Sequence, residues 1–235
     1  MSESYEIINQ EQHRGCFVKV DKNHGHAECM HVVKLLPQEV AKAATEFPIC
    51  FMRSTDTEPL QMVAIMGLEK GHNAYFADGR LNTIYVPLNI ARAPFSLAKT
   101  SQESPVYLAV KHTALNTEGL GEKLFDDNGE ASAFLTAKQS MLQAIAAQEE
   151  LAEQLVTTLT DLGLLVEFDF KYDLGNGQKK RIPGLYSVDK ALLKSLDDET
   201  KLSLVNNGLL EVIYSHLLSL GQFQRVVSLA ADQQA

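Results

Sequence analysis

The stretch from Ser132 to Leu162 contains the longest regular pattern in the chain. Apolar side chains recur through it at helical spacing. Lys138, Gln148 and Glu153 are among the polar side chains between them. Spacings of three and four residues place the apolar side chains on one face of an α-helix. Gly163 is suited to end a helix, because glycine readily adopts left-handed backbone angles. The stretch therefore predicts one long amphipathic helix or two broken ones.

A second pattern follows directly, with a period of two instead of 3.6. Val166, Phe168, Phe170 and Tyr172 alternate with charged residues, which is typical of a strand with one apolar face. The turn sequence Gly175-Asn176-Gly177 returns the chain toward residues 181–188, so we predict a β-hairpin here.

The rest of the C-terminal half predicts helices. Ser187 is a candidate cap for a helix through Leu196, and Asp197 or Asp198 for another that stops at residues 206–208. From Leu209 to about Ala230, apolar residues again follow helical spacing. Gly221 is expected to bend or interrupt this last helix.

The N-terminal half is rich in short β-prone runs separated by Pro, Gly, Asn and Asp. One short helix is expected over Pro37 to Glu46. Asp78-Gly79 is a tight-turn signal. The candidate strands are residues 17–20, 31–36, 49–53, 61–68, 74–76, 83–88, 95–99 and 106–111.

Together these patterns predict an α+β protein in which a β-rich N-terminal part packs with a helical C-terminal part containing the hairpin. We expect a single unit over residues 1–235. The polar stretch from Asn116 to Glu130 is the best boundary if the chain divides into a β-rich part, 1–115, and a helical part, 131–235. The exposed helical faces also allow a homodimer, although packing within one chain explains the same amphipathicity.

Composition excludes several function classes. The formal net charge of −9 repels nucleic acid and anionic membrane surfaces. No apolar stretch approaches the roughly 18 residues that cross a bilayer, so membrane insertion is not expected. The polar, acidic N-terminus lacks the features of a secretory signal, and Cys16, Cys29 and Cys50 form no C-x-x-C pair. We therefore expect a cytoplasmic location, free thiols and no cofactor.

The segment from Tyr85 to Phe95 contains two prolines and the isolated cation Arg92. A guanidinium pressed against a sheet surface needs a carboxylate, carbonyl or ligand partner. Two interpretations stay open. In the first, Arg92, with Tyr85 nearby, recognises an anionic ligand or partner segment; in the second, Arg92 is a structural arginine paired with an acidic residue.

No motif in the chain specifies a reaction. The P-loop, the G-x-S-x-G elbow, the H-E-x-x-H helix and the dinucleotide-binding fingerprint are absent. His24, His26 and His31 are a weak candidate for a metal site, and a polar loop beside a strand explains the same residues. An enzyme with a dispersed site would use Arg92 to hold a carboxylate and Tyr85 or His13 for proton transfer.

Several blocks, in order, resemble the SapC-like family of bacterial proteins. They include Glu11 to Arg14, Glu46 to Phe51, Tyr85 to Phe95, Leu124 to Gly129, Gly184 to Asp189 and Leu209 to Phe223. The family tends to carry two adjacent arginines in its Y-V-P-x-x-I-R-R-x-P-F segment. Here Ala91 precedes Arg92, which weakens any two-arginine anion clamp.

The resemblance implies a role rather than a reaction. The family name points to a paracrystalline surface layer, and an unrelated peptide-transporter permease of the same name is excluded by the lack of membrane spans. Members of the family look commonly encoded beside outer-membrane TonB-dependent receptors and flavin-dependent halogenase-like proteins, which implies a cytoplasmic accessory role in uptake or modification of a nutrient. We therefore expect a non-enzymatic accessory protein in surface-layer biogenesis, export or nutrient uptake and modification. The alternative is an enzyme with a dispersed active site for a small anionic substrate.

Overall fold

The computed structural model describes residues 4–55, 57–98, 106–175, 177 and 179–233. Two compact units emerge, each built from two stretches of chain. The first unit consists of residues 1–22 and 90–147, and the second of residues 23–89 and 148–235. Helix α4 (Ala133–Asp161) contributes residues to both.

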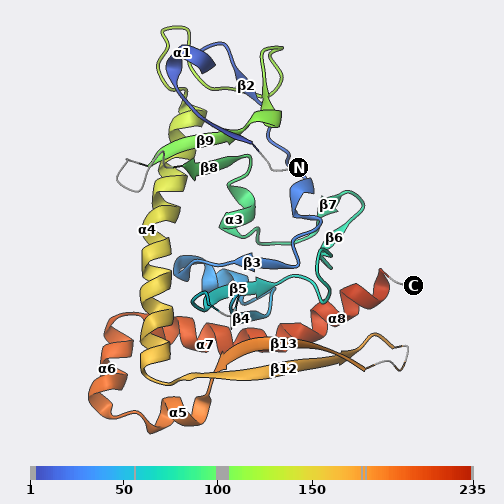
Figure 1. Ribbon diagram of the computed structural model, residues 1–235, viewed down its shortest axis with the longest axis vertical. Helices are drawn as coiled ribbons and strands as arrows, with labels where there is room; N and C mark the ends of the chain where they lie inside the picture. The colour runs from blue at the N-terminus through green and yellow to red at the C-terminus, as the bar shows by residue number, and fades with distance from the viewer. Residues whose placement is uncertain (1–3, 56, 99–105, 176, 178, 234–235) are drawn as a thin grey trace. The chain divides into compact units, whose positions relative to one another are not determined.

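The first unit contains two small antiparallel sheets (Figure 1). In one, β9 pairs with β1 and β8; in the other, β2 pairs with β10 and β11. Ser132 caps the start of α4, because the Leu135 N–H donates to its hydroxyl. The elements are β1 (Tyr5–Ile7), α1 (Gln10–His13), β2 (Phe17–Val18), β8 (Phe95–Ala98), β9 (Tyr107–Lys111), η3 (His112–Ala114), β10 (Leu115–Asn116) and β11 (Glu122–Lys123).

The second unit is built on a five-stranded antiparallel sheet in the order β12-β13-β4-β5-β3. Its strands are β3 (Val32–Lys34), β4 (Ile49–Met52), β5 (Gln61–Ile65), β12 (Leu165–Asp173) and β13 (Lys179–Val188). A small hairpin of β6 (Phe76–Ala77) and β7 (Arg80–Leu81) turns at Asp78-Gly79, where both residues have positive φ. The turn signal in the sequence is thereby confirmed.

Helices complete the second unit. They are η1 (Gly25–Ala27), η2 (Pro37–Glu39), α2 (Val40–Ala43), α5 (Lys190–Ser195), α6 (Asp198–Asn206), α7 (Leu209–Ser219), η4 (Leu220–Gln222) and α8 (Phe223–Asp232). A further short helix, α3 (Leu88–Ala91), crosses the boundary between the units.

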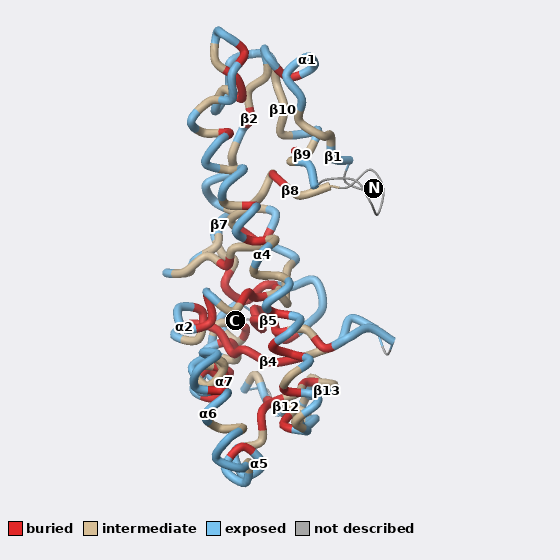
Figure 2. The backbone as a smooth tube through the Cα atoms, turned by 90° about the vertical axis from the view of Figure 1, so that its left-hand side faces the viewer, coloured by how far each residue is buried: buried red, intermediate tan, exposed pale blue. Residues whose placement is uncertain are grey.

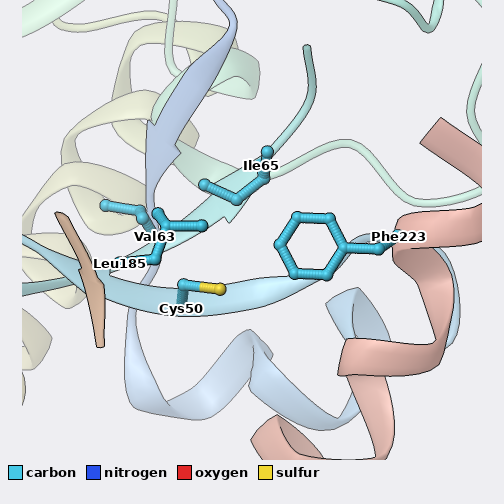
Figure 3. Packing of buried hydrophobic residues seen from close by; sticks show 5 residues of the cluster. All are labelled: Cys50, Val63, Ile65, Leu185 and Phe223. Atoms are coloured by element: carbon cyan, nitrogen blue, oxygen red, sulfur yellow. The ribbon is translucent and has the colours of Figure 1, made fainter. Parts of the chain in front are cut away.

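Residues from both halves of the chain meet in one apolar cluster of the second unit. Figure 3 shows Phe223 of α8 directed toward Cys50 of β4 and Ile65 of β5. Val63 and Leu185 complete the cluster, and Phe170 of the hairpin stacks on Phe223 with ring centroids 3.9 Å apart. Figure 2 shows the buried backbone concentrated at β4 and β5. This core therefore joins the C-terminal helix and the hairpin to the central sheet.

The mixed α+β class and most elements agree with the sequence patterns. The long amphipathic stretch is a single helix, the hairpin forms, and Gly221 lies in η4, between α7 and α8. Asp197 caps α6 by accepting from the Thr200 N–H. Asn176 of the hairpin turn and Lys99 of an expected strand lie outside the described residues.

Two local predictions were wrong. Residues 83–88 form no strand, because buried carboxylates, rather than a neighbouring strand, accept hydrogen bonds from their backbone. Ser187 does not cap a helix: α5 starts three residues later, and Asp189 accepts from the Ala191 and Leu192 N–H groups. Ser187 instead ends β13 and contacts His216.

Within the described ranges, none of the helices combines the length and the apolar character needed to cross a bilayer.

Candidate functional site

The buried carboxylate of Glu46, in the connection between α2 and β4, holds the segment from Thr83 to Leu88. Glu46 has only 2% of its surface exposed. The Ile84 N–H lies 3.0 Å from both of its oxygens, and the Tyr85 N–H donates to Oε2 at 2.9 Å. Two consecutive backbone N–H groups thus converge on one anion, which fixes the backbone at these positions.

A second buried carboxylate anchors the other end of the segment. Glu39, 1% exposed, accepts from the Leu36 N–H, from the Leu88 N–H and from the Tyr85 hydroxyl, which lies 2.8 Å from Oε2. Burial raises the pKa of Glu39, and these three hydrogen bonds partly offset the rise. Residues 83–88 are therefore bound at both ends by carboxylates that lie on either side of α2. We call them the anchored loop.

An arginine from the C-terminal helix completes this network. Arg225 of α8 lies 3.2 Å from Glu46 Oε1, and its guanidinium lies over the Tyr75 ring at 5.6 Å. The Tyr75 hydroxyl donates to the Glu46 carbonyl. Arg225 is half-exposed, so it neutralises the buried carboxylate while remaining accessible to solvent.

The anchored loop exposes a large apolar side chain. Ile84 is 95% exposed, although its own N–H is fixed to Glu46. The adjacent Thr83 hydroxyl oxygen is buried and has no hydrogen-bond partner among the described residues. A single exposed isoleucine on a mobile segment is ordinary. Here buried carboxylates hold the backbone of Ile84, so its backbone conformation is already fixed before any partner binds.

The predicted site residues occupy different surroundings. Tyr85 belongs to the second unit, whereas His13 and Arg92 belong to the first. Burial, followed by the hydrogen bond to Glu39, raises the pKa of Tyr85, so its phenol stays protonated and serves as a donor. Arg92 is half-buried, and no ion pair joins it to any residue in the described part of the chain.

His13 is buried in α1 and faces a carboxylate. Its Nε2 atom lies 3.5 Å from Glu6 Oε2, and its Nδ1 atom lies 3.1 Å from the Asn9 carbonyl oxygen. Glu6 also pairs with His112, and this contact is the main reason that the pKa of Glu6 is lowered. No hydrogen bond or ion pair between described residues connects His13 to Arg92.

The three histidines of the metal hypothesis do not form one group. The rings of His24 and His26 lie 6.0 Å apart, edge to face. His31 accepts from the Gly71 N–H, and burial lowers its pKa. Among the described residues, no set of three or more His, Cys, Asp or Glu side chains has a metal-binding arrangement.

His216 is the most deeply buried histidine of the described residues, and no sequence pattern marks it as a candidate. Its Nδ1 atom lies 2.7 Å from the Ile49 carbonyl oxygen, while Nε2 faces the Ser187 hydroxyl and the Val188 N–H. Burial lowers the pKa of His216 to about 4. The neutral ring therefore donates to Ile49 and accepts at Nε2. Ser187 and His216 resemble a nucleophile and its base, but both are buried. Their hydrogen bonds instead connect α7 to β4 and β13.

A groove of about 700 Å³ lies between η2, α2, α4 and α7 in the second unit. Amide and hydroxyl side chains alternate there with aliphatic ones, and Glu211 is the single ionisable residue among the described lining. Such a lining suits binding but supplies no acid–base pair. The polar lining residues are Gln38, Gln148, Gln154, Thr158, Asn207 and Ser215.

Sequence reasoning identified Tyr85 but missed Glu39, Glu46 and Ile84. Glutamates in a short predicted helix ordinarily face solvent, and no local pattern marks these two as buried. The available signal was the position of Glu46 at the start of one of the blocks that carry the family resemblance.

Comparison with known families decides the relationship. The sequence model of the SapC family matches residues 8–226 of the 235-residue chain. The chain belongs to the SapC family. The match includes Glu39, Glu46, Ile84, Tyr85 and Arg225, so the whole network of the anchored loop lies within the family region. No curated protein and no solved structure matches the chain.

Proposed function

We propose that this SapC-family chain is a non-enzymatic accessory protein of the cytoplasm, and that it binds a protein partner through the anchored loop. The partner belongs to a system for surface-layer biogenesis, export, or uptake and modification of a nutrient, such as a TonB-dependent receptor or a flavin-dependent halogenase-like protein. The family membership supports this class of role.

One observation carries the proposal: Ile84 is fully presented to solvent on a backbone fixed by Glu46. Binding energy at protein interfaces concentrates in a few apolar anchors that fill pockets on the partner. A side chain whose backbone is already ordered loses less conformational entropy on binding. The anchored loop has both properties.

The competing enzyme hypothesis finds less support in these contacts. Tyr85, its candidate for proton transfer, donates to Glu39 and has a raised pKa. A general acid or base works best when its pKa is near the operating pH. The groove lined by neutral amides offers no replacement for it. Turnover of a small anionic substrate by this chain alone would contradict the accessory role.

The test is affinity capture of the tagged chain from its native cells, followed by native mass spectrometry. Wild type is compared with Ile84→Ser, which removes the apolar side chain and keeps the backbone N–H. We expect a stoichiometric partner with wild type and an affinity about tenfold weaker or worse with Ile84→Ser. The melting temperatures of the two proteins should agree, because the Ile84 residue is 95% exposed in the free chain.

Leu218→Ser is the matched control, since Leu218 of α7 is also exposed and apolar but lies outside the anchored loop. It should retain the partner. Equal recovery with wild type and Ile84→Ser, or equal loss with both variants, would contradict the assignment of binding to this loop.

A further inference from the structure

The far end of the β12–β13 hairpin has a charge opposite to that of the chain as a whole. Residues 171–181 contain four basic side chains and one acidic one, Asp173, in a protein of net charge −9. The basic residues are Lys171, Lys179, Lys180 and Arg181. We call this region the basic hairpin end.

The strand register places one pair of like charges directly opposite each other, whereas Lys179 lies opposite Asp173. Lys171 of β12 lies directly opposite Arg181 of β13. Like charges at directly opposed positions destabilise an antiparallel pair. A glutamate at position 171 would convert this repulsion into attraction, so a lysine at position 171 does not serve the stability of the isolated hairpin.

Ion pairs within the chain use only part of this charge. Arg181 pairs with Asp169 at 2.7 Å, and Lys180 pairs with Glu69 at 2.6 Å. Asp173 accepts from the Gly175 and Gly177 N–H groups of the turn. Lys171 and Lys179 have no ion pair with any residue that the structure describes. Both ammonium groups are exposed and available to a partner.

The basic hairpin end is also concave and accessible. A hollow of about 530 Å³ is lined by residues 171–173 and 179–181, with the buried Tyr172 among them. Among the described residues, β13 pairs with β4 only at Tyr186, and the hairpin extends beyond the ends of β4 and β5 (Figure 1). Protection of an exposed strand edge against aggregation is another reason for lysines here. Acidic side chains would give the same protection, so this role does not explain why the charge is positive.

We propose that the basic hairpin end binds an acidic, extended segment of a partner protein. Lys179 and Arg181 are two residues apart on one strand, so they repeat at roughly 6.6 Å, the spacing of alternate residues in an extended peptide. Carboxylates at alternate positions of such a peptide match this repeat, and carboxylates hydrogen-bond well to both ammonium and guanidinium groups.

A nucleic acid fits less well. Asp169 and Asp173 lie on the same strand as Lys171, on either side of it, and the rest of the chain has a net negative charge. A long polyanion would extend beyond the roughly 8 Å screening length and meet that negative field. A short acidic peptide stays within the basic hairpin end.

The full chain is tested by fluorescence anisotropy with the labelled synthetic tetrapeptide Glu-Thr-Glu-Thr, whose two carboxylates match the repeat of Lys179 and Arg181. The tetrapeptide Lys-Thr-Lys-Thr and a single-stranded oligothymidylate are measured in parallel. We expect binding of the Glu peptide alone, weakening as salt is raised. No binding of the Glu peptide, or tighter binding of the oligothymidylate, would overturn the proposal.

Lys171→Glu separates binding from stability. It should weaken binding of the Glu peptide about fivefold and, because it faces Arg181, raise the melting temperature. Lys171→Gln keeps the test valid if the charge reversal disturbs the fold, and it should also weaken binding. Lys194→Glu makes the same charge change on α5 and should leave affinity unchanged. Equal affinities for wild type and both Lys171 variants would contradict the assignment.

Discussion

Glu46 combines, at the scale of one residue, three interactions that the sequence does not connect. Its carboxylate accepts from two consecutive N–H groups nearly forty positions later, and it pairs with Arg225 of the last helix. Tyr85 was a candidate because it lies near Arg92 in the segment from Tyr85 to Phe95, but no local sequence pattern identifies the distant acceptors that hold it. Arg92 and His13 remain predictions whose function no contact decides.

Replacing Glu46 with Gln tests this network. Gln keeps the shape but presents one amide group that cannot accept, so an N–H or Arg225 loses its partner. We expect a loss of about 2 kcal/mol in the free energy of unfolding, measured in urea at neutral pH. The control Glu150→Gln, at an exposed position of α4, should change it by less than about 0.5 kcal/mol. Equal stabilities for both variants would show that the carboxylate is dispensable.

His216 predicts a pH dependence. Its pKa is about 4 in the fold and 6.5 in the reference state, so the unfolded chain binds a proton first as the pH falls. Neutral His216 therefore contributes stability above pH 6.5 that is lost progressively between pH 6.5 and 4, by about 3 kcal/mol in total. His216→Asn should reduce this slope, whereas the exposed His72→Asn should not. An unchanged slope in His216→Asn would contradict the burial of a neutral ring.

At the scale of the element, periodicity was sufficient for the long helix and the hairpin. The apolar spacing of α4 and the alternation of β12 persist over many residues, so single exceptions do not obscure them. The anchored loop has a strand-like composition, yet its N–H groups bind carboxylates. The amino-acid composition of a segment indicates its preference for an extended backbone. It does not identify the group that accepts hydrogen bonds from the backbone N–H groups.

The start of α5 gives a test at this scale. Asp189→Ala removes the acceptor of the Ala191 and Leu192 N–H groups, so we expect a loss of about 1 kcal/mol in thermal or urea unfolding. Asp189→Ser should retain most of the stability because serine also caps helices. A stable Asp189→Ala variant would place the effective cap elsewhere.

At the scale of the whole molecule, each unit is assembled from two separated stretches of chain. The division that the sequence suggested, between 1–115 and 131–235, follows the order of the chain. Contact between distant segments cannot be derived from local periodicity, which explains why the meeting of α8, β4 and the hairpin in one core was not predicted. The possible homodimer remains a prediction, as does the cytoplasmic location.

We propose that the anchored loop contacts a protein partner through Ile84. The most direct test of this proposal is photo-crosslinking in native cells, with p-benzoyl-phenylalanine placed at position 84 and, as a control, at position 218. We expect a crosslink to one other protein from position 84 and none to that protein from position 218. The proposal would be contradicted if position 84 gave no crosslink or joined only two copies of this chain. It would also be contradicted if positions 84 and 218 gave the same crosslinks.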